Sequence, residues 1–370
     1  MPSAGAPREG PCIALVQQGD PVRPDSWSGV PFGLTKGLHA AGCEVVPVDV
    51  EFRGAGTLAR LLRMSWADQA TSRAFAAAFG VNGKRRIRAL AGVDGVVTIG
   101  SSYSLSTNLN QVTFEDMTVA QALRQPDPAY TSLSKRGAAR WRNRQRRNYE
   151  LSTACCVASE WAAASVRDDY GVPAAKVRTV GLGTNIEIAP RERDWSVPRF
   201  LFVGVDWERK RGPAVVSAFA KVRESHPEAT LDLIGGHPTV EAEGVIEHGR
   251  LPLGSPEGQQ RYVELLADST CMLMPSKFEP FGIAYLDAAV AGIPSIGTTV
   301  GGAADAIGAG GRLVDPADPA ALVAAMRELA DPETARELGD RARSRGADIT
   351  WAAVARRVLD ALFPKEGRMT

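Results

Sequence analysis

Short runs of apolar residues alternate along the first half of this chain with segments whose apolar residues recur at helical spacing. Unbroken runs of this kind are typical of strands buried on both faces of a parallel sheet. After the first run, Val30, Leu34 and Leu38 fall on one face of a predicted helix, with Ser28 as its N-cap and Gly42 at its end. The predicted strands are residues 12–17, 44–50, 93–99, 154–158 and 176–180.

The same alternation starts again after a break. Residues 185–198 contain Glu, Arg and Pro without an apolar period, so we interpret them as an interdomain linker. Strands alternating with helices predict a doubly wound α/β domain in each half. The strands predicted beyond the linker are residues 200–205, 230–234, 244–247, 270–274 and 294–297, and the last helices lie near 319–329, 332–345 and 351–362.

Length and composition agree with two globular domains. A chain of 370 residues is too long for one ordinary core, and its 44% hydrophobic and 23% charged residues are ordinary for a globular protein in water. No apolar run reaches the roughly 18 residues of a membrane span, and residues 1–10 are polar, so we expect a cytoplasmic protein without a targeting segment. The five cysteines lack metal-ligand spacing, which predicts buried thiols in a reducing compartment.

Two acidic residues in the second half carry the clearest chemical signal. Glu279 is followed by Pro280, Phe281 and Gly282, a turn that leads into an apolar helix, and Asp287 stands eight positions after Glu279. We expect Glu279 at the carboxyl end of a strand and Asp287 about two helical turns further on, facing the same crevice. The free amides at the start of such a helix attract phosphate, whereas carboxylates accept hydrogen bonds from hydroxyl groups. The site is therefore predicted to bind a sugar carried on a phosphate.

A cationic loop follows the first strand of the second half. It contains Arg209, Lys210 and Arg211, just before a helix that begins at Pro213. Carboxyl ends of strands face the ligand crevice in sheets of this type. Lysine supplies a point charge and arginine a two-pronged donor, so the loop is suited to a diphosphate. A solvated charged loop is the alternative interpretation.

The stretch around Glu279 resembles the Glu-x7-Glu signature of the retaining GT-B glycosyltransferases, specifically glycosyltransferase family 4. The resemblance implies that Glu279 contacts the donor hexose and that amides after the turn at Phe281 and Gly282 help to hold it. It also implies that the second acid binds the nucleotide ribose. The family has Glu at that position, and this chain has Asp287.

The cationic loop is similar to a Gly-Arg-Leu-x-x-x-Lys-Gly stretch of the same family. Lys210 matches the lysine, but Val205 stands at the arginine position, so we assign the arginine's role to Arg209. Arg211 stands where the family usually has glycine. The resemblance implies that Arg209 and Lys210 stabilise the charge that builds on the leaving diphosphate.

The fold expected from the resemblance is two Rossmann-like doubly wound α/β domains facing across a cleft, the GT-B architecture. Residues 1–184 would form the N-terminal, acceptor-side domain, and 185–198 the linker. Residues 199–348 would form the nucleotide-sugar-binding domain, and 349–370 a C-terminal helix that crosses back to the first domain.

Three further residues are candidates for the donor and acceptor sites. Gly29 lies in a loop similar to the family's Gly-rich loop, which lets the donor phosphate approach the backbone, and Leu251 lies where the family holds the base. Gly301 and Gly302 match the family's Gly-Gly loop, although a plain turn explains either glycine pair about as well. In one interpretation Asp116 orients an acceptor hydroxyl or contacts the donor sugar. In the other, it is the N-cap of a helix running to residue 125.

A basic run between residues 135 and 147 accounts for most of a charge asymmetry. Residues 1–150 hold 19 lysines and arginines against 12 acidic residues, although the whole chain carries a net charge of +1. Trp141 and Tyr149 stand on one face of the predicted helix, so we interpret the run as a solvated helix with a thin packed edge. Contact with an anionic membrane or an anionic acceptor is the alternative, and missing interleaved aromatics disfavour nucleic acid. The arginines concerned are Arg140, Arg142, Arg144, Arg146 and Arg147.

These features predict a metal-independent, retaining hexosyltransferase that uses a nucleoside diphosphate sugar as donor and an acceptor hydroxyl. In the mechanism that the resemblance implies, the departing phosphate helps to deprotonate the acceptor, and two cations do the work of a divalent ion. No cofactor is therefore expected. A sugar phosphorylase of the same fold and a catalytically inactive nucleotide-sugar-binding protein are the alternatives. The base, the sugar and the acceptor stay open.

Overall fold

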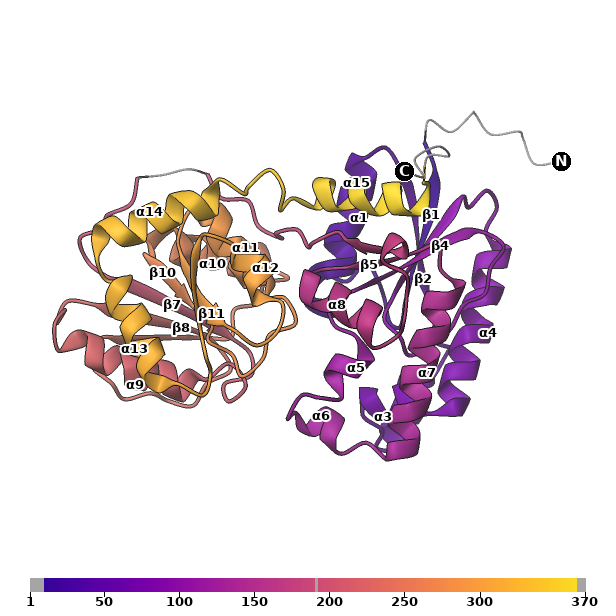
Figure 1. The fold of residues 1–370 in the computed structure, drawn as a ribbon, viewed down its shortest axis with the longest axis horizontal. Helices are drawn as coiled ribbons and strands as arrows, with labels where there is room; N and C mark the ends of the chain where they lie inside the picture. The colour runs from indigo at the N-terminus through magenta and orange to yellow at the C-terminus, as the bar shows by residue number, and fades with distance from the viewer. Residues whose placement is uncertain (1–9, 190–191, 365–370) are drawn as a thin grey trace. The chain divides into compact units, whose positions relative to one another are not determined.

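The chain forms two compact units. The computed structural model describes residues 10–189 and 192–364. Unit 1 comprises Met1–Gly181 together with Trp351–Thr370, and unit 2 comprises Leu182–Thr350 (Figure 1). Unit 1 is thus built from two separate stretches of chain, whereas unit 2 is continuous.

Unit 1 contains a sheet of six parallel strands in the order β2-β1-β3-β4-β5-β6. The order runs outward from β1 in both directions, which defines a doubly wound, Rossmann-like sheet. β1 and β3 are buried along their whole length, as their unbroken apolar runs predict. The strands are β1 Cys12–Gln17, β2 Glu44–Asp49, β3 Gly95–Ile99, β4 Asn110–Glu115, β5 Ala154–Val157 and β6 Val177–Thr179.

Helices cover both faces of this sheet. α4 packs Phe75 and Phe79 against Ala14 and Val16, on one face of β1. α7 and α8 cover neighbouring strands on that face, and α1 and α15 cover the other (Figure 1). The helices are α1 Val30–Ala40, α2 Ala55–Leu61, α3 Trp66–Thr71, α4 Arg73–Ala89, α5 Val119–Ala122, α6 Pro128–Thr131, α7 Lys135–Leu151, α8 Glu160–Asp168 and α15 Trp351–Leu362.

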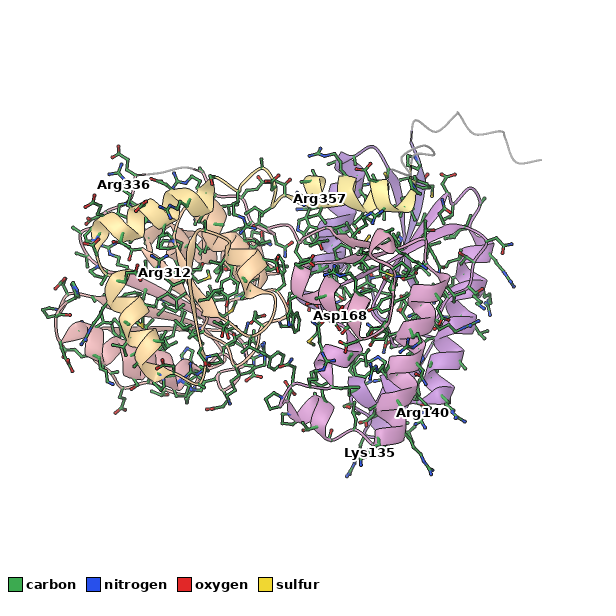
Figure 2. The ribbon with its side chains drawn as sticks, in the orientation of Figure 1. Lys135, Arg140, Asp168, Arg312, Arg336 and Arg357 are labelled. Atoms are coloured by element: carbon green, nitrogen blue, oxygen red, sulfur yellow. The ribbon has the colours of Figure 1, made fainter. Side chains whose placement is uncertain are left out.

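The last helix, α15, packs on the first helix of the same unit. Gly33 and Gly37 lie one turn apart on α1, and a Cβ on either would come within 2.1 Å of Trp351. The two glycines therefore leave the space that the start of α15 occupies. Further along α15, Arg357 donates to the Val180 carbonyl at 2.9 Å (labelled in Figure 2).

Unit 2 repeats the design with a parallel sheet in the order β12-β11-β10-β7-β8-β9. Its core is formed by Phe200 and Phe202 of β7, Phe219 of α9 and Met326 of α13. The strands are β7 Arg199–Gly204, β8 Thr230–Gly235, β9 Val245–Gly249, β10 Cys271–Leu273, β11 Ser295–Thr298 and β12 Gly311–Val314. The helices are α9 Gly212–Arg223, α10 Pro256–Asp268, α11 Ile283–Ala291, α12 Ala303–Ile307, α13 Pro319–Glu328 and α14 Pro332–Arg343.

The segment interpreted as a linker, residues 185–198, is counted with unit 2. Its Arg193 is fixed there, because the guanidinium donates to the carbonyls of Leu266, Ala291 and Gly292 at 3.0–3.3 Å. Residues 190 and 191 lie outside the described residues.

Two strands were not predicted. β4 contains Gln111 and Thr113, both buried, so its pattern is not that of an apolar run. Gln111 is satisfied by the Leu105 and Leu151 carbonyls, which no local pattern reveals. β12 follows a glycine-rich stretch and has only four residues.

Candidate active site

Glu279 lies just beyond β10 and pairs with the loop that follows β11. Its amide donates to the Val300 carbonyl at 3.0 Å, and its own carbonyl accepts from the Gly302 amide at 2.9 Å. Gly301, between them, has a φ of +115°, and a Cβ there would lie 2.0 Å from the Glu279 carbonyl oxygen. Only glycine fits this approach without strain, so the Gly301-Gly302 loop positions Glu279.

Glu279 and Lys210 form a buried ion pair. Lys210 is 8% exposed and Glu279 is 6% exposed. Lys210 donates from Nζ to Glu279 Oε2 and, at 2.9 Å, to the sulfur of Met274. Ser276 Oγ donates to the same Oε2 at 3.0 Å. Within residues 10–189 and 192–364 no group donates to Glu279 Oε1, so this oxygen keeps hydrogen-bonding capacity for a ligand.

Arg209 lies beside this pair and is partly open to solvent. Its side chain is 24% exposed, and a guanidinium nitrogen lies 3.6 Å from Glu279 Oε2. The guanidinium also donates to the Phe278 carbonyl at 3.1 Å and stacks 5.3 Å from the centre of the Phe278 ring. The cation therefore has a defined position while part of it can still contact a ligand.

The backbone ties the cationic loop to the Glu279 loop. The Arg209 amide donates to Asp206 Oδ1 at 3.0 Å, and the Arg209 carbonyl accepts from the Lys277 amide at 2.8 Å. Arg211, the residue before α9, has a φ of +60°. This left-handed conformation is one that glycine adopts without strain, which is a physical reason for the glycine that the resemblance places there.

The surroundings of the Lys210–Glu279 pair disfavour the charged form of Lys210. Burial lowers the pKa of Lys210, the Glu279 carboxylate partly offsets this, and Arg209 lowers the pKa further. Two cations thus share the neighbourhood of one buried carboxylate. An anion beside Arg209 and Lys210 would favour their charged forms.

The turn after Glu279 presents the start of α11. Phe281 is buried, and Gly282, with a φ of +91°, is the N-cap and supplies no side-chain cap to the first amides of the helix. Tyr285 fixes the helix by donating from its hydroxyl to the Met274 carbonyl at 2.6 Å. Uncapped amides at a helix start are suited to an anion or a sugar oxygen.

Asp287 belongs to a different set of contacts. It is 4% exposed and is therefore a buried acid of α11, not a surface one. Thr184 donates to its Oδ1 at 2.7 Å and Tyr262 to its Oδ2 at 3.1 Å. Burial raises the pKa of Asp287 to about 6, against the lowering effect of these hydrogen bonds. The carboxylate therefore links α11 to α10 and to residue 184, and its contact with a ribose stays a prediction.

The remaining predicted residues lie apart from this cluster in the chain. Leu251 is in the loop after β9 and accepts at its carbonyl from the Leu253 amide at 2.9 Å. Gly29 lies in unit 1 and is buried, with a φ of +78°, at the N-cap of α1. The prediction of Ser28 as N-cap is wrong, because Gly29 is the N-cap of α1 and Ser28 itself has a φ of +55°. Trp27, Ser28 and Gly29 together form a left-handed turn, which costs backbone energy at the two non-glycine residues.

Asp116 follows β4 in unit 1 and is half-buried. The alternative in which it caps a helix is wrong, because Thr118 caps α5 and forms a capping box with Gln121. Its neighbour Glu115 is a buried acid that was not singled out. Glu115 accepts from Tyr149 Oη and from Gln145 Nε2, the latter at 2.6 Å, and burial raises its pKa to about 7.

Within the described ranges, no three His, Cys, Asp or Glu side chains gather in a way that would hold a metal ion. No described helix is long and apolar enough to cross a bilayer. Metal independence stays a prediction.

Solved structures of the same fold define the class of this chain. It superimposes on sucrose-phosphate synthase from Thermosynechococcus elongatus with a TM-score of 0.70, at 19% identity, covering 95% of this chain and 98% of the other. WaaG, a glycosyltransferase involved in lipopolysaccharide biosynthesis, has a TM-score of 0.66 at 16% identity, covering 95% and 100%. HepE from Anabaena, solved in complex with UDP and glucose, has a TM-score of 0.62 at 12% identity, covering 95% and 99%. The fold is GT-B, with two Rossmann-like domains.

A family model narrows this class for part of the chain. Residues 197–331, which contain Arg209, Lys210, Glu279 and Asp287, match the family described as "Glycosyl transferases group 1". Glycogen synthase from Mycobacterium tuberculosis is 33% identical over 167 residues, 42% of this chain and 40% of that protein. N-acetyl-alpha-D-glucosaminyl L-malate synthase from Bacillus anthracis is 38% identical over 143 residues, 36% of each. The matched region thus spans less than half the length of these relatives.

Proposed function

We propose that this chain is a retaining, metal-independent glycosyltransferase that moves a hexose from a nucleoside diphosphate sugar to an acceptor hydroxyl. The observation that carries the proposal is the buried Lys210–Glu279 pair with Arg209 beside it, at the carboxyl edge of the unit 2 sheet. The cluster lies inside the region that matches glycosyl transferases group 1. The UDP and glucose bound to a protein of similar fold support a nucleotide-sugar donor.

In this proposal Arg209 and Lys210 hold the diphosphate. Lys210 is already placed by Glu279 and Met274, so little reorganisation is needed when charge builds on the leaving group. Nζ has three hydrogens and uses two of them in these contacts, which leaves one for a phosphate oxygen. Arg209 adds a two-pronged donor from the solvent-open side.

Glu279 holds the hexose. Its Oε2 is occupied by Lys210 and Ser276, so a sugar hydroxyl donates to Oε1. The amides after Phe281 and Gly282 donate to the sugar or to the phosphate next to it. A charged acceptor whose other oxygen is fixed can follow the small movement of a hydroxyl as the ring flattens in the transition state.

The acceptor proton passes to an oxygen of the departing phosphate, so the proposal requires no side-chain base. The bond between the anomeric carbon and the phosphate oxygen breaks while the acceptor oxygen bonds to the same face, which retains the configuration. Gly29 as a backbone neighbour of the donor phosphate, Leu251 beside the base and Asp116 beside the acceptor or the donor sugar complete the proposal.

A screen of nucleoside diphosphate hexoses tests the reaction. We expect slow hydrolysis of one donor, with release of nucleoside diphosphate and hexose, and then transfer to a hydroxyl acceptor with an unchanged anomeric configuration by NMR. A chelator should leave the rate unchanged. Phosphate-dependent turnover without nucleotide release would instead support the phosphorylase, and no turnover with any donor would support the inactive binding protein.

Glu279→Gln tests the role of the carboxylate. Loss of a charged hydrogen bond costs about 1.5–3 kcal/mol, so turnover should fall roughly ten- to a hundredfold with little change in nucleotide affinity. Asp232→Asn is the matched control, because Asp232 is also a shielded acid in the unit 2 sheet, bonded to His248 at 2.6 Å. Equal turnover in the Glu279 variant and the control would contradict the assignment.

A further inference from the structure

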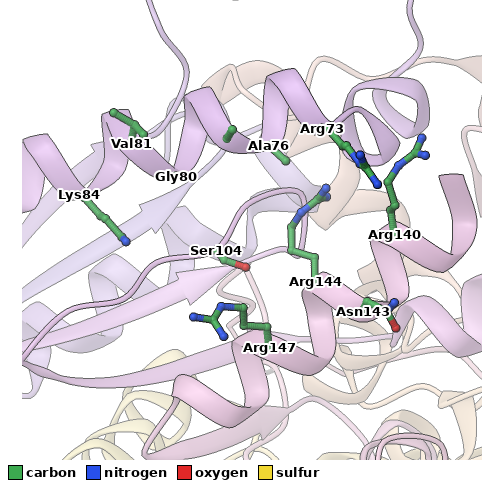
Figure 3. Close-up of a pocket in the computed structure, with 11 residues that line it drawn as sticks. Arg73, Ala76, Gly80, Val81, Lys84, Ser104, Arg140, Asn143, Arg144 and Arg147 are labelled. Carbon is green, nitrogen blue, oxygen red and sulfur yellow. The ribbon is translucent and has the colours of Figure 1, made fainter.

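A groove between α4 and α7 of unit 1 takes no part in the proposed reaction. It has a volume of about 550 Å³. Small or apolar residues of α4 form one wall, and polar residues of α7 face them (Figure 3). Five cations line it: Arg73, Lys84, Arg140, Arg144 and Arg147.

The structure divides the arginines of the basic run between two faces of α7. Arg142 and Arg146 face the body of unit 1, where they donate to the carbonyls of Asp169 and Tyr170 at 3.0 and 2.9 Å. Both also lie over the Tyr170 ring, at 5.7 and 5.6 Å from its centre. They are packing residues. The groove is lined by Arg140, Arg144 and Arg147 of the same run.

Two of the groove cations are held in place by the end of α3. Arg140 donates to the Thr71 carbonyl at 3.2 Å, and Arg144 donates to the Ala70 carbonyl. Figure 3 shows Arg144 extending from α7 toward α4, and Arg73 and Arg140 pointing toward each other at one end of the groove. Arg140 and Arg144 are therefore positioned before a ligand arrives.

None of the five cations forms an ion pair within the described part of the chain. Burial, together with the charge of Arg140, lowers the pKa of Arg144 to about 10. Like charges held this close repel each other, and a bound anion would reverse that cost.

The floor of the groove adds a second, independent sign of a ligand. The hydroxyl oxygen of Ser104 is buried and has no hydrogen-bond partner within residues 10–189 and 192–364. Ser104 lies against α4 where Gly80 allows a close approach, since a Cβ on Gly80 would be 2.9 Å from the Ser104 carbonyl oxygen. Lys84 points from α4 toward this floor (Figure 3). A hydroxyl beside cations is suited to an anionic oxygen.

We propose that the α4–α7 groove binds the phosphate group of a phosphorylated ligand. Arg144, Lys84 and Ser104 contact the phosphate, and the wall of Ala76, Ala77 and Val81 contacts the rest of the ligand. A single carboxylate balances one cation, whereas a phosphate carries up to two charges and three acceptor oxygens. The phosphate belongs either to a soluble phosphate ester or to a phospholipid headgroup. This site does not depend on glycosyl transfer.

Titration calorimetry with inorganic phosphate and glycerol 3-phosphate at constant ionic strength tests the soluble source. The groove variant is Arg73→Gln/Lys84→Gln/Arg147→Gln, which removes cations without hydrogen bonds in the described structure. We expect at least a tenfold loss of affinity, because the Lys84 contact and two further positive charges of the groove are lost. Arg85→Gln/Arg86→Gln/Arg88→Gln, on exposed positions of the same helix, is the matched control and should lose less than about twofold. Arg312→Gln, at a part-exposed arginine of unit 2 outside the donor site, should bind as the parent does.

Ser104→Ala keeps every charge and should still weaken phosphate binding severalfold. Sedimentation with vesicles of phosphatidylcholine, with or without about one third phosphatidylglycerol, tests the lipid source. Binding that the groove variant loses and the control variant keeps supports the proposal, with either source. It is overturned if neither phosphate nor anionic vesicles bind, or if the groove and control variants lose binding equally.

Discussion

The two cationic regions of this protein differ in how their charges are balanced. In unit 2, Lys210 is buried against Glu279, and a serine and a methionine complete the surroundings of the pair. In unit 1, the five cations of the α4–α7 groove line a space of about 550 Å³, and no ion pair joins any of them within the described residues. Removing one partner of the Lys210–Glu279 pair would destabilise the protein, because the other charge would stay buried alone. In the groove, the like charges repel each other as long as no anion is bound.

The difference shows that cationic residues in a sequence can have different structural roles. The dense run on α7 contains packing residues and groove residues in almost equal number. By contrast, Lys210, which stands between two arginines in a short loop, is the most constrained cation of the site, held by a partner 69 residues away. Burial and partners, rather than density, decide what a cation does.

We expect the largest effect from removing the cation of the buried Lys210–Glu279 ion pair. Lys210→Met leaves Glu279 buried without its cation, so the free energy of unfolding should fall by about 3–5 kcal/mol. Lys210→Met/Glu279→Gln removes both charges and should recover much of this loss while staying inactive. Urea unfolding of the two single variants and the double variant measures the coupling. Additive losses would mean that the two side chains do not stabilise each other.

Asp287 is a buried carboxylate held by hydroxyl groups, and it should make the stability of the protein depend on pH. The pKa of Asp287 is raised to about 6, so its protonated form favours the folded state. The stability that this provides is complete below about pH 4 and is lost as the pH rises through about 6, on the order of 3 kcal/mol in total. Asp287→Asn should remove this slope from urea unfolding measured between pH 4 and 7.

A parallel slope in parent and variant would contradict the assignment of Asp287. Glu115 is the internal reference, since its pKa, raised from 4.5 to about 7, should produce a decline between about pH 4.5 and 7 in both proteins, so that the difference between them isolates Asp287. If Asp287 also contacts a ribose, the variant should bind a ribonucleotide donor less tightly than the parent does, with a smaller loss for the 2′-deoxy donor.

The next effect concerns Arg209, the exposed member of the paired region. Arg209→Gln should weaken binding of nucleoside diphosphate by about tenfold and leave free nucleoside unchanged, because only a phosphate contact is lost. Calorimetry on both ligands measures this. Arg312→Gln, which removes another part-exposed arginine of unit 2 paired with Glu328, is the control. Equal losses for nucleotide and nucleoside would place the role of Arg209 in folding.

We expect the smallest effect on stability from removing one cation of the α4–α7 groove. Arg147→Gln removes one of several crowded like charges, so the protein should become more stable by up to about 0.5 kcal/mol at low salt. Thermal unfolding at low and high ionic strength should show the gain and then its disappearance. A loss of stability at low salt would mean that Arg147 has a partner in the folded protein.

The sequence predicted those strands and helices that a pattern of neighbouring residues determines. The apolar runs located β1 and β10, and the Glu279-to-Gly282 turn located the start of α11. β4 escaped because its buried Gln111 is satisfied by carbonyls 6 and 40 residues away. A strand with buried polar residues looks like a loop in the sequence when the hydrogen-bond partners of those residues are unknown.

The candidate site was predictable in its residues but not in their contacts. Arg209, Lys210 and Glu279 were expected near one ligand, and the structure brings the three together. Asp287 was expected to face the same ligand, but its partners are Thr184 and Tyr262. The groove also needed the structure, since Arg73 and Lys84 of α4 are ordinary helix-surface cations until α7 lies beside them.

The contact of Trp351 with Gly33 and Gly37 has a consequence for biosynthesis. Synthesis runs from the N-terminus, so all of unit 2 leaves the ribosome before the helix that covers α1 and the unit 1 sheet. Until residue 362 has emerged, the apolar face that α15 buries through Trp351, Val354 and Val358 has no cover. A nascent chain of this protein therefore completes its second unit first, and the α15-binding face of its first unit stays exposed until the last helix arrives.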